Sequence, residues 1–207
     1  MMENSQIPDI AVSRLPVYLQ TLNLLLREGT EVVSSQKLAD LLGTTATQIR
    51  KDLSFFGGFG KQGSGYNVIR LHEALKDILH LNKIWKVALF GMGHLGQALL
   101  RYQGLARRGF EIVLAFDVNE AVIGKKINGM TVLNEAHLEQ ELKKQNVQIA
   151  ILTVPAKDAQ RLADRLVLSG IKAILSYAPI IIKAPDNVQI SYVEPVLQLQ
   201  KMTFYLE

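Results

Sequence analysis

The chain contains no cysteine, which excludes disulfide bonds and cysteine-ligated metal centres such as the common structural zinc sites. No apolar run approaches the roughly 18 to 20 residues that a membrane-spanning helix needs. The N-terminal segment, with the acidic Glu3 and Asp9, does not form a secretory signal. These absences predict a cytoplasmic protein that has no membrane partner and binds no metal.

The chain does contain enough apolar sequence for one large or two small cores, because 48% of its 207 residues are hydrophobic and 20% are charged. Two domains are favoured. The formal net charge of +4 is a mild indication of a polyanionic partner. Between residues 44 and 71, a group of basic residues that includes Arg50, Lys51 and Lys61 faces a single acid, Asp52.

A glycine-rich run directly follows the apolar stretch Trp85–Phe90. It has the G-x-G-x-x-G spacing of dinucleotide-binding loops, where the glycines allow a tight turn, close approach to the pyrophosphate and close packing of the next helix. The phosphates then lie at the N-terminus of that helix, expected over residues 95–105. The alternative is a structural glycine turn in an ordinary α/β domain. The predicted phosphate-loop residues are Gly91, Met92, Gly93, His94, Leu95 and Gly96.

The next expected strand, Phe110–Asp117, ends in an acid. Asp117, which is followed by Val118, is placed to accept the 2′- and 3′-hydroxyls of a ribose and to repel the 2′-phosphate of NADP. NAD(H) is therefore the predicted ligand. The alternative is that Asp117 caps the turn that follows it.

Two further strand ends complete the predicted nucleotide site. Strands expected over residues 148–154 and 172–176 each lead into a short segment with a proline. Ligands of parallel sheets bind at the carboxyl edge, so these segments are predicted to form walls of the nicotinamide pocket. Ordinary loops would have the same sequence pattern. The residues are Thr153, Val154, Pro155, Ser176, Tyr177, Ala178 and Pro179.

Four helices are expected in the first part of the chain, over residues 16–27, 36–42, 45–55 and 71–81. The second ends at a glycine, and the third opens with a capping-box pattern at Thr45. Two short helices joined by such a turn are typical of a helix-turn-helix motif, whose second helix enters the major groove of DNA.

A glycine-rich segment over residues 56–68 suits a tight hairpin, which beside a helix-turn-helix motif would be a wing. Gln48, Arg50 and Lys51 supply an amide and two cations near a helix start, where major-groove binders contact bases and phosphates, and Lys61 is placed to reach a minor groove or a phosphate. The alternatives are a solvated helix face and a flexible basic loop. The residues predicted to contact DNA are Ser35, Thr45, Gln48, Arg50, Lys51, Ser54, Lys61, Gly63 and Tyr66.

Strands and helices alternate after residue 84, which predicts a doubly wound parallel sheet of the Rossmann type. In addition to the elements above, helices are expected over residues 136–145 and 158–169. An edge strand is expected over residues 129–133 and a last strand over residues 188–193.

The C-terminal segment carries more apolar surface than a terminal helix beside a finished sheet requires, so a second chain is expected to bury it. The predicted fold is therefore α/β with three parts. They are a winged helix-turn-helix DNA-binding domain over residues 1–83, a Rossmann NAD(H)-binding domain over residues 84–193 and a C-terminal dimerisation helix over residues 194–207.

A dehydrogenase also needs an acid or base at the reacting carbon, most often histidine. Here His72 and His80 belong to the fourth helix, His94 to the phosphate loop and His137 to a polar helix face. None is well placed for hydride transfer, so the chain is predicted to bind the nucleotide as an effector and not to be an enzyme. A small NAD-dependent oxidoreductase with a helical appendage is the alternative. A third possibility is a nucleotide-binding module whose basic domain contacts protein.

In this combination of motifs the chain resembles the bacterial Rex family of redox-sensing transcriptional repressors over nearly its whole length. The runs that carry the resemblance are residues 13–15 with Tyr18, 48–57, 63–66, 91–102, 116–118, 152–156 and 170–175.

The resemblance implies a homodimer that exchanges its C-terminal helices, binds a palindromic operator in double-stranded DNA and dissociates when NADH binds. NAD⁺ would compete for the site without forcing release. Tyr102 would lie near the nicotinamide and help to report its redox state. Where the family commonly has an arginine and an aspartate that form an ion pair, this chain has Gln20 and Glu194, and Ser176 replaces the family's asparagine. These differences bear on the coupling between the two sites.

Overall fold

The computed structural model describes residues 7–61 and 64–206. They divide into two compact units, within residues 1–83 and 84–207, and each unit has its own core. None of the helices in these described ranges is long and apolar enough to cross a membrane.

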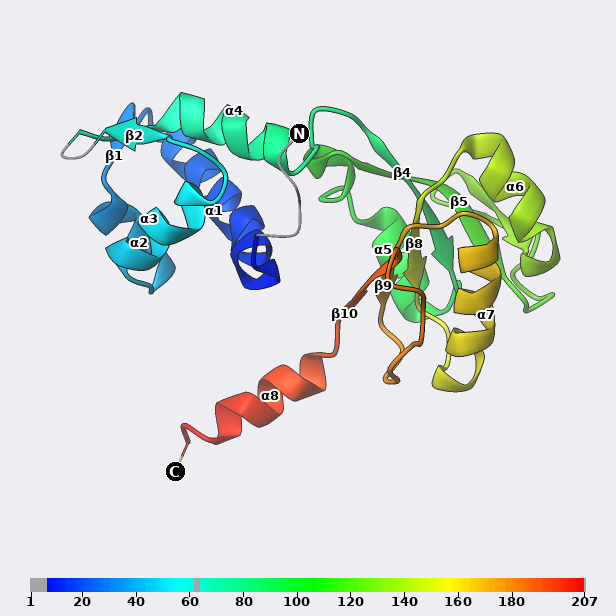
Figure 1. Ribbon diagram of the computed structural model, residues 1–207. Coiled ribbons are helices and arrows are strands. Elements are labelled where there is room, and N and C mark those ends of the chain that lie inside the picture. The colour runs from blue at the N-terminus through cyan, green and yellow to red at the C-terminus, as the bar shows by residue number, and fades with distance from the viewer. Residues whose placement is uncertain (1–6, 62–63, 207) are drawn as a thin grey trace. The chain divides into compact units, whose positions relative to one another are not determined.

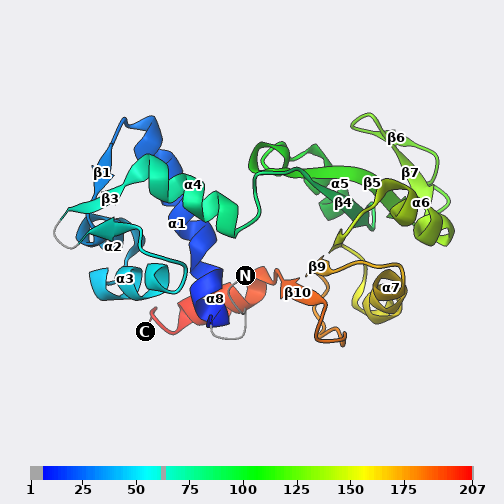
Figure 2. The same ribbon diagram turned by 45° about the horizontal axis from the view of Figure 1, so that its top comes forward.

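Among the described residues of the first unit, four helices form most of the structure, and α2 and α3 lie side by side in both ribbon views (Figures 1 and 2). The second and third begin with hydroxyl caps, since Ser34 accepts a hydrogen bond from the Lys37 amide and Thr45 accepts one from the Gln48 amide. Gly43, in the left-handed conformation with φ of 64°, ends α2. The helices are α1 (Asp9–Arg27), α2 (Ser35–Leu42), α3 (Ala46–Ser54) and α4 (Val68–Ile78).

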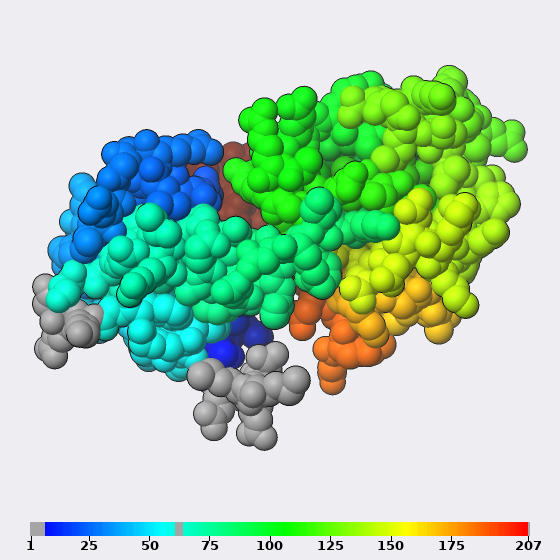
Figure 3. Space-filling model, turned by 90° about the horizontal axis from the view of Figure 1, so that it is seen from above, coloured from blue at the N-terminus to red at the C-terminus, as the bar shows by residue number. Residues whose placement is uncertain are grey.

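The fourth helix begins three residues earlier than the sequence predicted. The Asn67 side chain accepts a hydrogen bond from the Arg70 amide and so caps the helix directly after a strand. Val68, Leu71 and Leu75 face the core of this unit, together with Leu22 of α1. Blue-green α4 forms part of the surface of the first unit in the space-filling view (Figure 3).

A small antiparallel sheet completes the first unit, with the strand order β1-β3-β2. Its hairpin is the predicted wing. The sequence prediction missed β1, because two residues give no measurable alternation. Gly65 has φ of +71°, and a Cβ atom there would lie 2.8 Å from the carbonyl oxygen of Val33, so glycine is required where these strands pack. The strands are β1 (Val32–Val33), β2 (Gly60–Lys61) and β3 (Gly65–Asn67).

The second unit is built on a seven-stranded sheet with the order β10-β9-β8-β4-β5-β7-β6, parallel except for β6. The prediction that residues 129–133 form an edge strand of the sheet was wrong. The two-residue strand β6 forms a hairpin with β7 and is itself the edge strand (Figure 2). The strands are β4 (Trp85–Phe90), β5 (Phe110–Asp117), β6 (Lys126–Ile127), β7 (Met130–Asn134), β8 (Ile149–Leu152), β9 (Ala173–Ser176) and β10 (Gln189–Tyr192).

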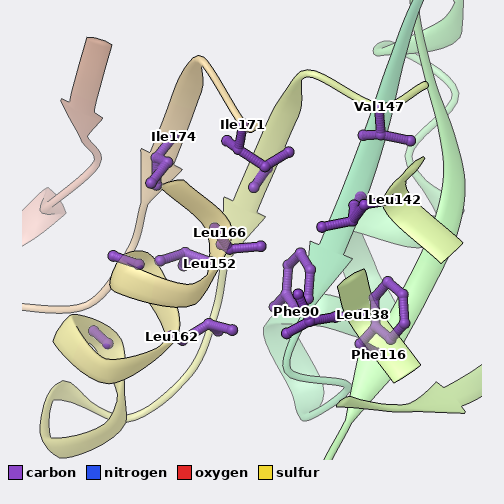
Figure 4. Close-up of a cluster of buried hydrophobic side chains, with 14 of the residues drawn as sticks. Phe90, Phe116, Leu138, Leu142, Val147, Leu152, Leu162, Leu166, Ile171 and Ile174 are labelled. Carbon is purple, nitrogen blue, oxygen red and sulfur yellow. The ribbon is translucent and has the colours of Figure 1, made fainter. Parts of the chain in front are cut away.

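Helices cover both faces of this sheet, and the alternation along β4 shows how the two sides of the core form. Ala88 and Phe90 face α6 (Leu138–Gln145) and α7 (Ala156–Leu168), where Phe90 stacks on Phe116 with ring centroids 4.8 Å apart (Figure 4). Val87 and Leu89 face the opposite side, where α5 (His94–Arg101) packs. Both faces of the strand are buried, as its continuous apolar sequence indicates.

The helix that follows the phosphate loop is shorter than the sequence predicted. The prediction that the helix after the phosphate loop runs to residue 105 was wrong, because Tyr102 adopts an extended conformation and ends α5 at Arg101. A 3-10 turn, Ala106–Arg108, follows. The C-terminal helix α8 (Pro195–Thr203) has no buried residue.

Candidate nucleotide site and nucleic-acid interface

The phosphate loop connects the carboxyl end of β4 to α5. Its three glycines have different surroundings. Gly91 has φ of +92°, and a Cβ atom there would lie 2.7 Å from the carbonyl oxygen of Thr153. A Cβ atom at Gly96 would collide with the carbonyl oxygen of Gly91. Gly93 faces open space, with nothing within 4 Å of a Cβ position. The first and third glycines therefore fold the loop, and the second leaves room for a ligand.

The N-terminus of α5 suits an anion. Gly93 is its N-cap and offers no side-chain acceptor, so amides of the first turn stay available to a ligand, while His94 and Leu95 are exposed. Met92 differs from them, since its side chain is buried and its amide donates to Oδ2 of Asp117 at 2.5 Å. Met92 thus holds the conformation of the loop, and the amides available to a ligand belong to the residues after it. The exposed first turn of α5 therefore fits a pyrophosphate.

Asp117 caps the turn that follows it, as the alternative interpretation expected, and it also holds the phosphate loop. Its Oδ1 accepts a hydrogen bond from the Asn119 amide at 2.8 Å, which caps the turn, and Oδ2 accepts the hydrogen bond from the phosphate loop. The carboxylate is half-buried at the end of β5, and Val118 beside it is exposed. Ionised carboxylate oxygens hold further lone pairs, so these two bonds leave acceptor capacity for ribose hydroxyls.

The register of the sheet brings the other predicted strand ends to the same edge. Phe90 pairs with Leu152, and Leu152 pairs with Ser176, so the residues that follow them are neighbours across three strands. The Thr153 hydroxyl lies 2.6 Å from the carbonyl oxygen of Gly91 and donates a hydrogen bond to it. This brace between the loop and β8 was not anticipated from the sequence.

The β9 end is shaped by a buried serine. Ser176 Oγ accepts a hydrogen bond from the Ala178 amide at 3.2 Å and holds the turn, while Tyr177 is half-buried beside the α5 side of the core. Pro179 is exposed, as Pro155 is at the neighbouring strand end. A short polar side chain at position 176 therefore preserves a local turn at the predicted nicotinamide wall.

Tyr102 lies at the opposite end of α5 from the phosphate loop. The eight residues of this helix span about 12 Å at 1.5 Å per residue. Tyr102 is 52% exposed, and its hydroxyl accepts a hydrogen bond from Arg108 at 3.3 Å. The proposed part of Tyr102 in reporting the redox state stays a prediction.

Across residues 7–61 and 64–206, no group of three His, Asp or Glu side chains is arranged to hold a metal ion. His72 lies between Asn23 and Glu73, with 2.9 Å from each ring nitrogen to an oxygen, and joins α4 to α1. His72 belongs to the first unit, whereas the phosphate loop belongs to the second.

The outer face of α3 carries three of the side chains predicted to contact DNA, those of Arg50, Lys51 and Ser54. Thr47, Arg50, Lys51 and Ser54 are all exposed and follow the three- and four-residue spacing of one helix face. Arg50 donates hydrogen bonds to Ser35 Oγ in α2 at 3.0 Å and to Thr47 Oγ1 in α3 at 3.1 Å. These two bonds orient its guanidinium between α2 and α3. Thr47 was missed by sequence reasoning, although its spacing from Arg50 and Ser54 was the available signal.

A hollow of about 580 Å³ lies between α2, α3 and the glycine-rich hairpin. Ser35, Arg50 and Ser54 line it, together with Tyr66, which is 9% exposed and packs in the core of the first unit. The structure thus brings together Ser35, Arg50 and Ser54, three of the residues predicted to contact DNA. Most of the Tyr66 side chain, in contrast, is inaccessible. Lys61 lies in β2, and Gly63 lies outside the described residues.

Gln48 and Asp52 lie one turn apart on α3, toward α1. The expected capping box forms only by half, because Thr45 accepts the Gln48 amide but the Gln48 side chain turns toward Asp52 and donates from Nε2 to Oδ1 at 2.7 Å. Arg14 donates from Nε to Oδ2 at 2.5 Å and from Nη2 to Oδ1 at 2.6 Å, and the Tyr18 hydroxyl donates to Oδ2 at 2.6 Å.

We call these four residues the Asp52 cluster. Asp52 is 0% exposed. Burial acts to raise its pKa, but the hydrogen bonds from Arg14, Tyr18 and Gln48 outweigh that effect and hold the pKa below the ordinary value of 3.8. Burial and the hydrogen bond to Asp52 raise the pKa of Tyr18, which therefore stays a neutral donor. Sequence reasoning counted Asp52 only as a charge.

A winged helix-turn-helix unit followed by a doubly wound sheet with a dinucleotide-type loop defines a class, the DNA-binding regulators with a nucleotide-binding domain. Comparisons with known proteins agree with it. A family model described as "Putative DNA-binding protein N-terminus" matches residues 6–54, and one described as "CoA binding domain" matches residues 82–180.

The chain belongs to the Rex family of redox-sensing transcriptional repressors. It is 50% identical over 206 residues to the redox-sensing transcriptional repressor Rex of Chloroflexus aurantiacus, covering 99% of this chain and 97% of the relative. With the protein of the same name from Roseiflexus sp. it shares 49% identity over 199 residues, or 96% of this chain and 90% of the relative. These relatives are named as repressors, which favours the regulator over the oxidoreductase.

Solved structures of a Rex-family repressor called RSP are also similar. Its complex with β-NAD⁺ and operator DNA matches with a TM-score of 0.91 and 38% identity, covering 97% of this chain and 92% of that chain. Its complex with β-NADH matches with a TM-score of 0.89 and 36% identity, covering 97% and 94%.

Proposed function

We propose that this chain represses transcription by binding operator DNA through α3 and the wing, and that NADH bound to the second unit releases it. The observation that carries the proposal is the pairing of two open sites in one chain. The exposed face of α3 presents Arg50 and Lys51, and the N-terminus of α5 is open at Gly93. The relative RSP is described both with operator DNA and with the two nucleotides, which supports the same pair of ligands here.

The DNA contacts follow from the chemistry of the α3 face. Lys51 is exposed and suits a phosphate or a guanine edge, and Arg50 suits a phosphate because its guanidinium lies beside the start of α2. Ser35 and Ser54 border the hollow and add hydroxyl donors. Thr45, as the cap of α3, and the hairpin with Lys61 and Gly63 flank this face in the sequence.

The effector is NAD(H), held by the phosphate loop and by Asp117. The carboxylate accepts ribose hydroxyls and repels the 2′-phosphate of NADP. The strand ends at Thr153 and Ser176 form the side on which the nicotinamide lies. Reduced nicotinamide is neutral and oxidised nicotinamide is cationic, so an apolar wall there favours the reduced form.

The acting species is a homodimer in the cytoplasm that binds a palindromic operator. Two unpartnered apolar faces support the dimer, since α8 exposes Leu199 and Met202, and α1 exposes Ile10, Val17 and Leu24 at seven-residue intervals along one face. We propose that α8 of one chain covers α1 of the other. A dimer reads two half-sites about one helical turn apart, so a small reorientation displaces the second recognition helix.

The direct test is an anisotropy titration of an operator duplex with NADH and NAD⁺ in parallel. We expect operator affinity to fall as NADH is added, by a coupling free energy of about 1 to 3 kcal/mol, and to fall less with NAD⁺. Unchanged operator affinity across a full NADH titration would contradict the proposal.

A matched variant separates the two sites. Lys51→Ala is expected to weaken operator binding and to leave NADH binding intact, because the side chain is exposed on α3 and lies in the other unit from the phosphate loop. A parallel loss of DNA and NADH binding would mean that the variant has failed to fold.

A further inference from the structure

The Asp52 cluster places a charged group directly behind a residue of the DNA-contacting helix. Gln48 is half-buried at the edge of the exposed α3 face, and its side-chain nitrogen is bound to a fully buried carboxylate. Arg14 and Tyr18, four residues apart on α1, hold that carboxylate from the other side. The arrangement ties α3 to α1 through side chains alone.

We propose that Asp52 is a specificity-determining positioning residue, which fixes the orientation of the Gln48 amide and thereby the base that Gln48 selects. An ionised carboxylate only accepts hydrogen bonds, so the amide must direct nitrogen toward it. The Oε1 acceptor and the second N–H of Gln48 then remain for DNA. This acceptor and donor pair matches the N6 and N7 edge of adenine.

The charge on Asp52 is what makes the orientation unique. Arg14 supplies a fixed positive charge with two hydrogen bonds, and the Tyr18 hydroxyl adds a third donor, so the carboxylate stays ionised although it is buried. If position 52 carried an amide, it could donate as well as accept. Gln48 could then turn its oxygen inward and present two donors, and the preference for adenine would be lost.

A purely structural explanation predicts something different. A buried ion pair often contributes little net stability compared with apolar packing of the same volume, so stability alone is weak grounds for its presence. If the cluster only held α3 in place, weakening it would reduce affinity for every DNA sequence alike. A positioning role predicts a change at one base position.

The inference rests on the proposed DNA-binding function, and one experiment separates the two. A library of randomised DNA duplexes is selected with the full chain, and the bound duplexes are sequenced to give a base preference at each position. Gln48→Ala identifies the position that Gln48 contacts. Asp52→Asn is expected to reduce the adenine preference at that same position severalfold, from the roughly 5- to 150-fold of a bidentate contact, and to leave the other positions unchanged.

The control is a second glutamine and aspartate pair with the same spacing. Gln36 Nε2 donates to Asp40 Oδ1 at 2.8 Å on the exposed side of α2, so Asp40→Asn makes the same charge change in the same unit. It is expected to leave every base preference unchanged. An unaltered preference in Asp52→Asn, a uniform loss at all positions, or no position that depends on Gln48 would overturn the inference.

Two further results keep the outcomes distinct. A wild-type chain that selects no sequence contradicts the proposed function itself.

If Asp52→Asn does not fold, nuclear magnetic resonance of the wild-type chain tests the orientation of the Gln48 side-chain amide. The signals of that amide are assigned by their loss in Gln48→Ala. One of its two protons is expected to be shifted downfield and slow to exchange, and two freely exchanging protons would overturn the inference.

Discussion

At the scale of single residues, the proposed ligand contact of Asp117 can be tested separately from its contacts within the fold. The carboxylate accepts hydrogen bonds from the Met92 and Asn119 amides and still offers lone pairs toward the nucleotide side. Asp117→Asn keeps an oxygen that can accept one of these bonds but removes the charge that repels a 2′-phosphate. We therefore expect the ratio of NADPH to NADH affinity to rise about tenfold or more, in keeping with the 1.4 kcal/mol that corresponds to each factor of ten.

Titration of nucleotide fluorescence with both dinucleotides measures this ratio. Wild-type chain provides the reference, and far-ultraviolet circular dichroism checks that the fold is retained. An unchanged ratio together with weakened NADH binding would show that Asp117 acts on the loop alone.

The second prediction at this scale concerns acid stability. The pKa of Asp52 is raised by burial and lowered more by the hydrogen bonds of the cluster, so it lies below its unfolded value. A depressed pKa contributes stability that is complete above the unfolded value near 3.8 and is lost as the pH falls through the folded value. The urea midpoint of the wild-type chain should therefore fall from pH 5 to pH 3 more steeply than that of Asp52→Asn. Parallel declines would contradict this assignment.

At the scale of elements, the phosphate loop allows a test that separates folding from ligand binding. Gly93→Ala adds a methyl group into open space, while Gly96→Ala forces one against the Gly91 carbonyl. We expect Gly93→Ala to keep the melting temperature within a few degrees and to weaken NADH binding at least tenfold, because the pyrophosphate needs that space.

Gly96→Ala is expected to lower the melting temperature as well as NADH affinity, since α5 can no longer pack closely on the loop. Thermal unfolding and NADH titration of both variants measure the difference. Equal destabilisation by the two substitutions would show that Gly93 is also required by the fold.

The elements that could be predicted from sequence are those whose signals are local. Capped α2 and α3, the buried β4 and the phosphate loop each depend on residues close in the chain. The two-residue strands β1 and β6 could not be predicted, because they exist only through pairing with β3 and β7. The start of α4 was missed by three residues, since Asn67 ends a strand and caps the helix at once.

The residues of the candidate sites show the same difference between local signals and contacts made only in the folded chain. Arg50 and Lys51 could be predicted from their place near the start of a helix, whereas Arg14 lies 38 residues before Asp52 and contacts it only in the folded unit. The brace between Thr153 and Gly91 likewise spans 62 residues. Local pattern therefore predicted several exposed side chains, such as Arg50 and Lys51, and the contacts that hold such side chains in position required the tertiary structure.

At the scale of the whole molecule, the apolar surface of α8 is the feature that a single chain leaves unexplained. Leu199 is 60% exposed, and none of the residues of this helix is buried. Exposed apolar patches of this kind mark interfaces. If α8 joins two chains, the helix is also what makes two recognition helices available to one palindromic operator, so dimerisation and operator affinity should be lost together.

Leu199→Asp tests this link, with Gln198→Asp as the matched control on the same helix, because both add one charge and Gln198 is polar already. We expect Leu199→Asp to convert the dimer to a monomer in light scattering and to weaken operator binding at least tenfold, since a single half-site replaces two. Gln198→Asp should retain both dimer mass and operator affinity. NADH binding to the Leu199→Asp chain should persist, because the phosphate loop and Asp117 belong to one chain. A Leu199→Asp chain that stays dimeric with unchanged operator affinity would exclude α8 as the dimer contact.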